Sequence, residues 1–191
     1  MHPADRTGCL RAALALCALL AGPRALAAEP PAAAVEPRLL LGLQPSITVE
    51  PYYPEGVFDV NAAPLCAEWR AGRRVSLRAS PLVTLRFGVP GAPRLAHLGA
   101  EASLPIYLDE PVPGDPPSGF WAGPATALTR NVLDLHWTTG LHADFGYALR
   151  PSRRLALLFA GQLGGTLFLH DDGSRELKEH LGVKVAVGWW L

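Results

Sequence analysis

Apolar and polar residues alternate with a period of two along most of the chain after residue 38. The last segment is the clearest case, because every second residue in it is apolar: Leu181, Val183, Val185, Val187, Trp189 and Leu191. The residues between them are small or polar in most cases, as at Gly182 and Lys184. A period of two places successive side chains on opposite faces of a strand. The pattern therefore predicts β-strands, not helices.

Eight segments fit this strand period. The alternation is strictest in 39–50, 75–87, 135–149 and 180–191, and weaker in 57–70, 94–108, 119–131 and 154–169. Most of the breaks between segments contain Gly, Pro, Asp or Ser, which are the residues that favour turns. We therefore predict an all-β fold in which eight antiparallel strands follow one another up and down.

The polar face of these strands decides between a soluble domain and a membrane protein. A water-facing exterior would carry many Lys and Glu residues, but Lys occurs only at positions 178 and 184. The polar face instead holds Gly, Ser, Thr, Gln and His with single charges. The segments are also longer than the roughly 5–6 residues of ordinary strands, and a tilted membrane strand needs about 9–11. Because an open sheet edge cannot be satisfied in hydrocarbon, we expect an eight-stranded transmembrane β-barrel.

The N-terminus has the pattern of an export signal. Arg6 and Arg11 precede the apolar run 12–21, which is about half the length that spans a bilayer as a helix. Ala25 and Ala27 provide the small residues of a cleavage site. We expect a signal peptide at 1–27, a flexible leader at 28–37 and the barrel at 38–191. Only Cys66 remains after cleavage, so we expect no internal disulfide.

An exported chain with eight alternating strands and an amphipathic last strand resembles the small outer-membrane β-barrels of the OmpA/OmpX kind. The last strand is similar to their C-terminal assembly signal, although it ends in Leu191 where that signal usually has Phe. The resemblance rests on architecture and transfers no functional residue. It implies residence in the outer membrane, contact with outer-membrane lipids and lipopolysaccharide, and recognition by the barrel-assembly machinery through the last strand.

Side chains on the polar face are candidates for a network that fills the barrel interior. These are Glu68, Arg78, Arg86, Glu101, His142, Asp144 and Lys184. Both signs of charge occur, so we expect ion pairs across the interior, because an unpaired buried charge is costly. Aromatic residues near strand ends are candidates for the interfacial girdles of such barrels. These are Trp69, Trp121, Trp137, Tyr147, Trp189 and Trp190.

Three polar-face residues are weak candidates for hydrolytic chemistry: His97, Ser103 and Asp144. His97 and Glu101 are about 13 Å apart along one strand, too far for a direct hydrogen bond, so His97 would need a partner such as Asp144 from another strand. No spacing resembles a metal-binding motif, and we expect no metal or cofactor. Equal numbers of basic and acidic residues, 17 of each, argue against a nucleic-acid partner.

The expected function is that of a compact monomeric barrel whose filled interior makes it a poor pore, with a role in envelope integrity or in binding a small apolar or lipid ligand. The alternatives are a lipid A acyl hydrolase or transferase and a soluble periplasmic β-barrel binding module. Up-and-down order places the connections 51–56, 88–93, 131–134 and 171–179 outside the cell, and 71–73, 109–118 and 150–153 in the periplasm. The long connection at 109–118 fits poorly, because such barrels keep short periplasmic turns.

Overall fold

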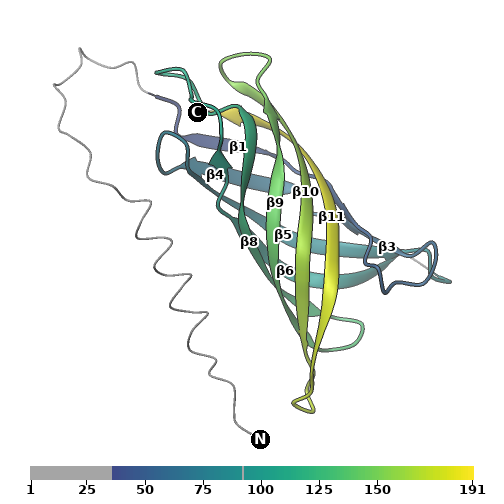
Figure 1. The fold of residues 1–191 in the computed structure, drawn as a ribbon. Coiled ribbons are helices and arrows are strands. Elements are labelled where there is room, and N and C mark those ends of the chain that lie inside the picture. The colour runs from purple at the N-terminus through teal and green to yellow at the C-terminus, as the bar shows by residue number, and fades with distance from the viewer. Residues whose placement is uncertain (1–35, 92) are drawn as a thin grey trace, which may run out of the picture. The chain divides into compact units, whose positions relative to one another are not determined.

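The computed structural model describes residues 36–91 and 93–191, and these residues form one antiparallel β-sheet (Figure 1). The strands are β1 (Leu39–Leu43), β2 (Ser46–Thr48), β3 (Phe58–Asn61), β4 (Leu65–Arg70), β5 (Ser76–Phe87), β6 (Arg94–Ser103), β7 (Ile106–Tyr107), β8 (Gly119–Asn131), β9 (Trp137–Leu149), β10 (Leu155–Leu169) and β11 (Arg175–Trp190). The described part of the chain has no helix long and apolar enough to cross a membrane. The predicted signal peptide and residues 28–35 of the predicted leader lie outside the described residues.

The strands pair as a ring of eight. The order β1–β4–β5–β6–β8–β9–β10–β11 returns to its start because β11 also pairs with β1, with Leu40 opposite Trp190. The three short strands extend longer members of the ring. Strand β2 extends β1 and pairs with β11, β3 extends β4 and pairs with β5, and β7 extends β6 and pairs with β8. Every chain segment thus pairs with the segment before it and the one after it. The predicted all-β class, the eight segments and their antiparallel sequential order are confirmed.

Prolines account for the three interruptions within these segments. Pro45 separates β1 from β2, Pro64 precedes β4, and Pro105 separates β6 from β7. Proline has no N–H to donate to the neighbouring strand, so regular pairing breaks where it stands. The chain still continues in the same direction, because Gln44 N–H donates to the Pro64 carbonyl and Leu104 N–H donates to the Pro124 carbonyl. The interruptions therefore leave the order of the ring unchanged.

The two faces of the sheet have opposite polarity, and the polar face is the buried one. In β9 the side chains of Thr138, His142 and Asp144 are buried inside the ring. The alternate residues point outward, and Leu141 and Phe145 are 71% and 52% exposed. Strand β11 repeats this arrangement with His180 and Lys184 inside. A water-soluble sheet protein buries its apolar face, so the arrangement here is inverted.

One end of the ring is closed by side chains and by the connection 108–118. An apolar cluster inside this end includes Leu40, Tyr107, Trp121 and Trp190, each at most 1% exposed. The connection is held over the cluster because Arg150 pairs with Asp115 at 2.6 Å and donates to the Pro116 carbonyl at 2.9 Å. This long segment thus packs as a plug at the end of the ring where β1 begins and β11 ends.

At the other end, the loop end, the connections 88–93, 132–136 and 170–174 have five or six residues, and the β2–β3 connection 49–57 has nine. Strand β11 begins at Arg175, so the predicted connection 171–179 is wrong in its second half, and only residues 170–174 link β10 to β11. The tight turn is possible because Gly173 adopts a φ of 82°. Residues 175–179 instead continue the ladder with β10, where Glu179 lies opposite Gly165.

Candidate functional site: the polar interior of the ring

Three groups of hydrogen-bonded side chains fill the ring from the plugged end to the loop end. The first is centred on Glu68 of β4, which has no exposed surface. Arg78 of β5 donates to Glu68 Oε2 from Nε at 2.9 Å and from Nη2 at 2.7 Å. The Tyr107 hydroxyl donates to Glu68 Oε1 at 2.9 Å, and the Arg78 guanidinium lies 4.6 Å from the Trp121 ring centroid. Both carboxylate oxygens and the guanidinium face are therefore satisfied.

The second group spans the full width of the ring. Lys184 of β11 forms ion pairs with Glu101 of β6 and with Asp144 of β9, the latter at 3.3 Å. The Gln162 amide of β10 donates to Glu101 at 3.2 Å and to Asp144 at 2.8 Å. Strands β6 and β11 are four places apart in the ring of eight, so Lys184 reaches across the interior. One ammonium and one amide thus bridge two buried carboxylates.

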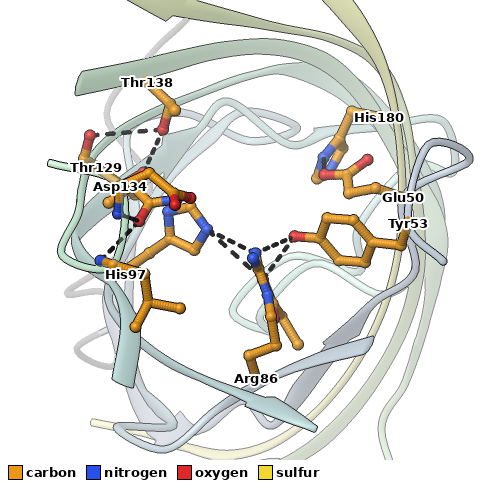
Figure 2. Close-up of polar contacts among 11 residues, drawn as sticks. Glu50, Tyr53, Arg86, His97, Thr129, Asp134, Thr138 and His180 are labelled. Atoms are coloured by element: carbon orange, nitrogen blue, oxygen red, sulfur yellow. Dashed lines mark hydrogen bonds and ion pairs between the residues drawn. The ribbon is translucent and has the colours of Figure 1, made fainter. Parts of the chain in front are cut away.

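The third group lies at the loop end, and Figure 2 shows three of its members, Tyr53, Arg86 and His97. Arg86 of β5 donates to both Asp59 oxygens, at 3.0 and 3.1 Å, and to the Tyr53 hydroxyl at 2.8 Å. Its Nη2 also lies 3.4 Å from His97 Nε2. Because a guanidinium can only donate, His97 Nε2 accepts and the ring proton sits on Nδ1, which has no partner.

Tyr53 in the β2–β3 connection is held in its neutral form. Its hydroxyl donates to Asp59 Oδ2 at 2.7 Å. Burial raises the pKa of Tyr53, and the negative charge of Asp59 raises it further. Burial also raises the pKa of the neighbouring Tyr52, with the charge of Glu50 adding to the effect. Both phenols therefore stay protonated and can serve as hydrogen-bond donors at physiological pH.

Two cavities open between these groups at the loop end. The inner cavity, of about 90 Å³, is lined among others by Glu50, His97, His142, Gln162 and His180. The outer cavity, of about 270 Å³, adds His136 and His170. They share Tyr52, Tyr53, His97 and Phe168 as lining residues, and we refer to the two together as the histidine chamber. Every histidine of the described chain lines this chamber.

The candidate hydrolytic residues do not come together. His97 and Ser103 are six residues apart on β6, which corresponds to about 20 Å along a strand. Asp144 is bonded to Lys184 and Gln162, and the carboxylate near His97 is Asp59, with Oδ2 3.6 Å from His97 Nε2. The suggestion that Asp144 serves His97 is wrong, because the register of the ring brings these residues to different levels. The arrangement is that of a hydrogen-bonded interior, not of a nucleophile beside its base.

Two of the six aromatic residues assigned to interfacial girdles are misassigned. Trp121 and Trp190 are each 1% exposed and lie inside the ring. Their positions follow from the period of two, since Phe120 and Trp189 next to them point outward. The other four point outward and are partly exposed: Trp69, Trp137, Tyr147 and Trp189. The position of an aromatic residue within the alternation, and not its closeness to a strand end, thus determines whether it faces outward.

Sequence reasoning placed the seven network candidates on the inward face, and the structure buries all of them except Arg86, whose side chain is 16% exposed. It missed three residues that complete these groups, Tyr53, Asp59 and Gln162, and it also missed Glu50, which contacts His180. Asp59 and Gln162 lie in segments with weak alternation, and Glu50 and Tyr53 lie at or beside a Pro-rich connection. Asp59 is nevertheless recognisable from the sequence, because it alternates with the apolar residues Phe58 and Val60 and therefore lies on the opposite, inward face of the strand.

Comparisons with known proteins give no independent indication of function. No family model matches the chain, and searches of curated proteins and of solved structures found no match. The geometry of the ring is therefore the basis for a functional proposal.

Proposed function

We propose that residues 38–191 form a transmembrane β-barrel of the Gram-negative outer membrane, which contributes to envelope integrity as a monomer and does not conduct ions steadily. The observation that carries the proposal is the inverted polarity of the closed ring. Its exposed face presents large apolar side chains on every long strand, while its buried face holds ion pairs and hydrogen-bonded amides. Hydrocarbon outside and a polar interior satisfy both faces at once.

A soluble periplasmic binding module would leave this outer face in water. The strand β10, for example, would then expose Phe159 and Leu163 at 48% and 59%. Contiguous apolar surface of this kind marks contact with a membrane or a partner. Lipids and lipopolysaccharide of the outer membrane are the partners that this face fits, and a chain with such a surface would require the barrel-assembly machinery for insertion.

The filled interior supports a structural role over a pore. An eight-stranded barrel is just wide enough for its side chains to fill. Here the Glu68–Arg78 pair, Trp121 and Trp190 occupy the plugged end, and the connection 108–118 packs over them. For the lipid-modifying alternative, the separation of His97 from Ser103 offers no support. Comparing the lipid A mass of cells with and without the protein tests that alternative directly.

The test of the proposal compares two outward leucines on neighbouring strands. Leu163 lies in the middle of β10, whereas Leu177 lies near the β10–β11 turn, and they are 59% and 73% exposed. In a bilayer, Leu163→Arg should cost about 2–4 kcal/mol of unfolding free energy and Leu177→Arg about 0–1 kcal/mol. In a soluble protein both changes should stay within about 0.5 kcal/mol.

Fractionation of cells provides a second, independent measurement. We expect the protein in the outer-membrane fraction, extractable only with detergent and migrating faster on a gel when unheated. Recovery in the soluble periplasmic fraction, together with equal effects of the two arginine variants, would exclude the membrane barrel.

A further inference from the structure

Histidines are concentrated in one place in this molecule. The sequence has six, and the five in the described chain, His97, His136, His142, His170 and His180, all line the histidine chamber. They come from three long strands and two connections, so the ring closure is what brings them together. Imidazole is the side chain that most often binds transition metals. The chamber therefore gathers potential metal ligands from distant parts of the chain.

Among these five histidines, His142 and His180 have the features most typical of metal ligands. They lie on β9 and β11, and both are opposite Gly164 of β10, which has no side chain to separate them. Their rings are stacked with centroids 3.9 Å apart and an interplanar angle of 19°. His142 is 5% exposed and His180 is 8% exposed, yet neither nitrogen of His142 has a partner, and His180 Nε2 has none. Buried polar atoms are normally satisfied, so these nitrogens point to a ligand.

Glu50 determines which ring nitrogen of His180 carries the proton. Its Oε1 lies 2.8 Å from His180 Nδ1, and Figure 2 shows the two side chains facing each other at the chamber wall. A carboxylate at Nδ1 holds the proton there and leaves the lone pair on Nε2. Metal-binding histidines almost always have such a carboxylate or carbonyl behind them, which orients the ring and raises its basicity. His180 therefore has the second-sphere support of a metal ligand.

Space and a third donor are present beside the pair. A Cβ atom at Gly182 would lie 3.3 Å from His180 Nε2 and 2.8 Å from Gln162 Oε1, so a side chain there would fill the gap between these two atoms. A Cβ at Gly140 would overlap the His142 ring. Since the Gln162 amide nitrogen is engaged by Glu101 and Asp144, its oxygen faces this gap. The two glycines thus leave space beside the His142 ring, His180 Nε2 and the Gln162 oxygen.

The charge of the interior favours a cation. Among the side chains from the loop end to the Lys184 group that are at most 16% exposed, there are four carboxylates, Glu50, Asp59, Glu101 and Asp144, against the two cations Arg86 and Lys184. This excess of two negative charges is buried, where screening by water is weak. A divalent cation would balance it.

We propose that the histidine chamber binds a divalent first-row transition-metal ion, with His142 and His180 as nitrogen ligands and the Gln162 amide oxygen and water completing the coordination. No three His, Cys, Asp or Glu side chains of the described chain are arranged to hold a metal, so this is a two-histidine site. One stacked ring must turn about χ2 to direct its lone pair at the shared ion. Nitrogen and oxygen donors of this kind suit Cu²⁺, Ni²⁺ and Zn²⁺.

The test uses the full chain without a polyhistidine tag, folded in detergent, and Cu²⁺ as the probe, because Cu²⁺ binds most tightly in this series. Titration should give one site per chain, and the electron paramagnetic resonance spectrum should show coupling to two nitrogens. His142→Ala and His180→Ala should each weaken binding at least about tenfold, and Glu50→Gln by about tenfold. Gel mobility without heating checks that each variant is folded.

The other histidine pair of the chamber supplies the matched control. His136 and His170 have ring centroids 5.1 Å apart, and their replacement by Ala should leave the affinity unchanged within about twofold. If the chamber holds only water, the folded wild type will show no saturable site and no nitrogen coupling. Equal loss in the control variants would instead indicate nonspecific capture by the loops. Either result overturns the proposal without bearing on membrane insertion, which fractionation measures separately.

Discussion

The Glu68–Arg78 pair gives the sharpest prediction about what stabilises the interior. Arg78→Met removes the guanidinium and leaves the Glu68 carboxylate buried with Tyr107 as its remaining donor. The two side chains are 3% and 0% exposed, so water does not screen the charge that is left behind. Removing one partner of a buried pair costs about 3–5 kcal/mol. The loss of two charge-assisted hydrogen bonds, at about 1.5–3 kcal/mol each, leads to a similar figure.

The assay is urea unfolding of the protein in phospholipid vesicles, with the folded fraction counted by gel mobility and by tryptophan fluorescence. Trp121 is a suitable reporter because Arg78 lies over its ring. Glu68→Gln should cost about as much as Arg78→Met, since it leaves an unpaired guanidinium. The double variant should cost far less than the sum of the two, because it buries no charge. Arg94→Met, at an exposed position, is the control and should stay within about 0.5 kcal/mol.

Additive costs in this double-mutant cycle would refute the reasoning. They would mean that each side chain acts through packing alone and that the pair has no coupling energy. A cost below about 1 kcal/mol for Arg78→Met would also contradict this prediction. It would mean that water reaches the Glu68 carboxylate and hydrates its charge when Arg78 is absent.

Three further predictions follow from the two ends of the ring. Asp115→Asn removes the carboxylate bound by Arg150, so proteolysis within 108–118 should become faster while the fold of the strands persists, and mass spectrometry of the fragments measures this. Burial lowers the pKa of His136, with His170 adding to the effect, so the folded state binds its proton less readily than the unfolded chain does. The connection 132–136 should therefore lose stability as pH falls below about 6.5, visible as lower amide protection factors after correction for the intrinsic exchange rate, an effect that His136→Gln removes. Planar-bilayer recordings of the folded protein should show no stable conductance steps, and large ion-selective steps would contradict the plugged interior.

Local periodicity determined what could be predicted from the sequence. Val183, Val185 and Val187 alternate with Lys184, which places Lys184 on the opposite, inward face of the strand. The structure buries Lys184 there. Trp121 and Trp190 lie near strand ends, as girdle residues do, but each follows an aromatic residue that points outward. The period of two therefore directs both side chains into the ring.

Partner identity could not be predicted in the same way. Lys184 and Glu101 are 83 residues apart, and their contact depends on ring closure and on the stagger of each strand against the next. A shift of two residues in one strand pair would keep every side chain on its face and still change all the partners. For this reason the inward charges were predictable as a set, whereas the pairing of Arg86 with Asp59 and the stacking of His142 on His180 were not.

The distribution of side chains along the ring axis sets the direction from which any ligand must arrive. The plugged end buries Leu40, Tyr107, Trp121 and Trp190 beneath a connection held by Arg150. The loop end instead has the outer cavity of about 270 Å³, which is lined by strand residues and by side chains of the connections 49–57, 132–136 and 170–174. A solute can therefore enter the histidine chamber from one side only, and the Lys184 group forms its floor. If this end faces the cell exterior, as the up-and-down order of the strands predicts, the chamber would exchange ions with the external medium and not through the membrane.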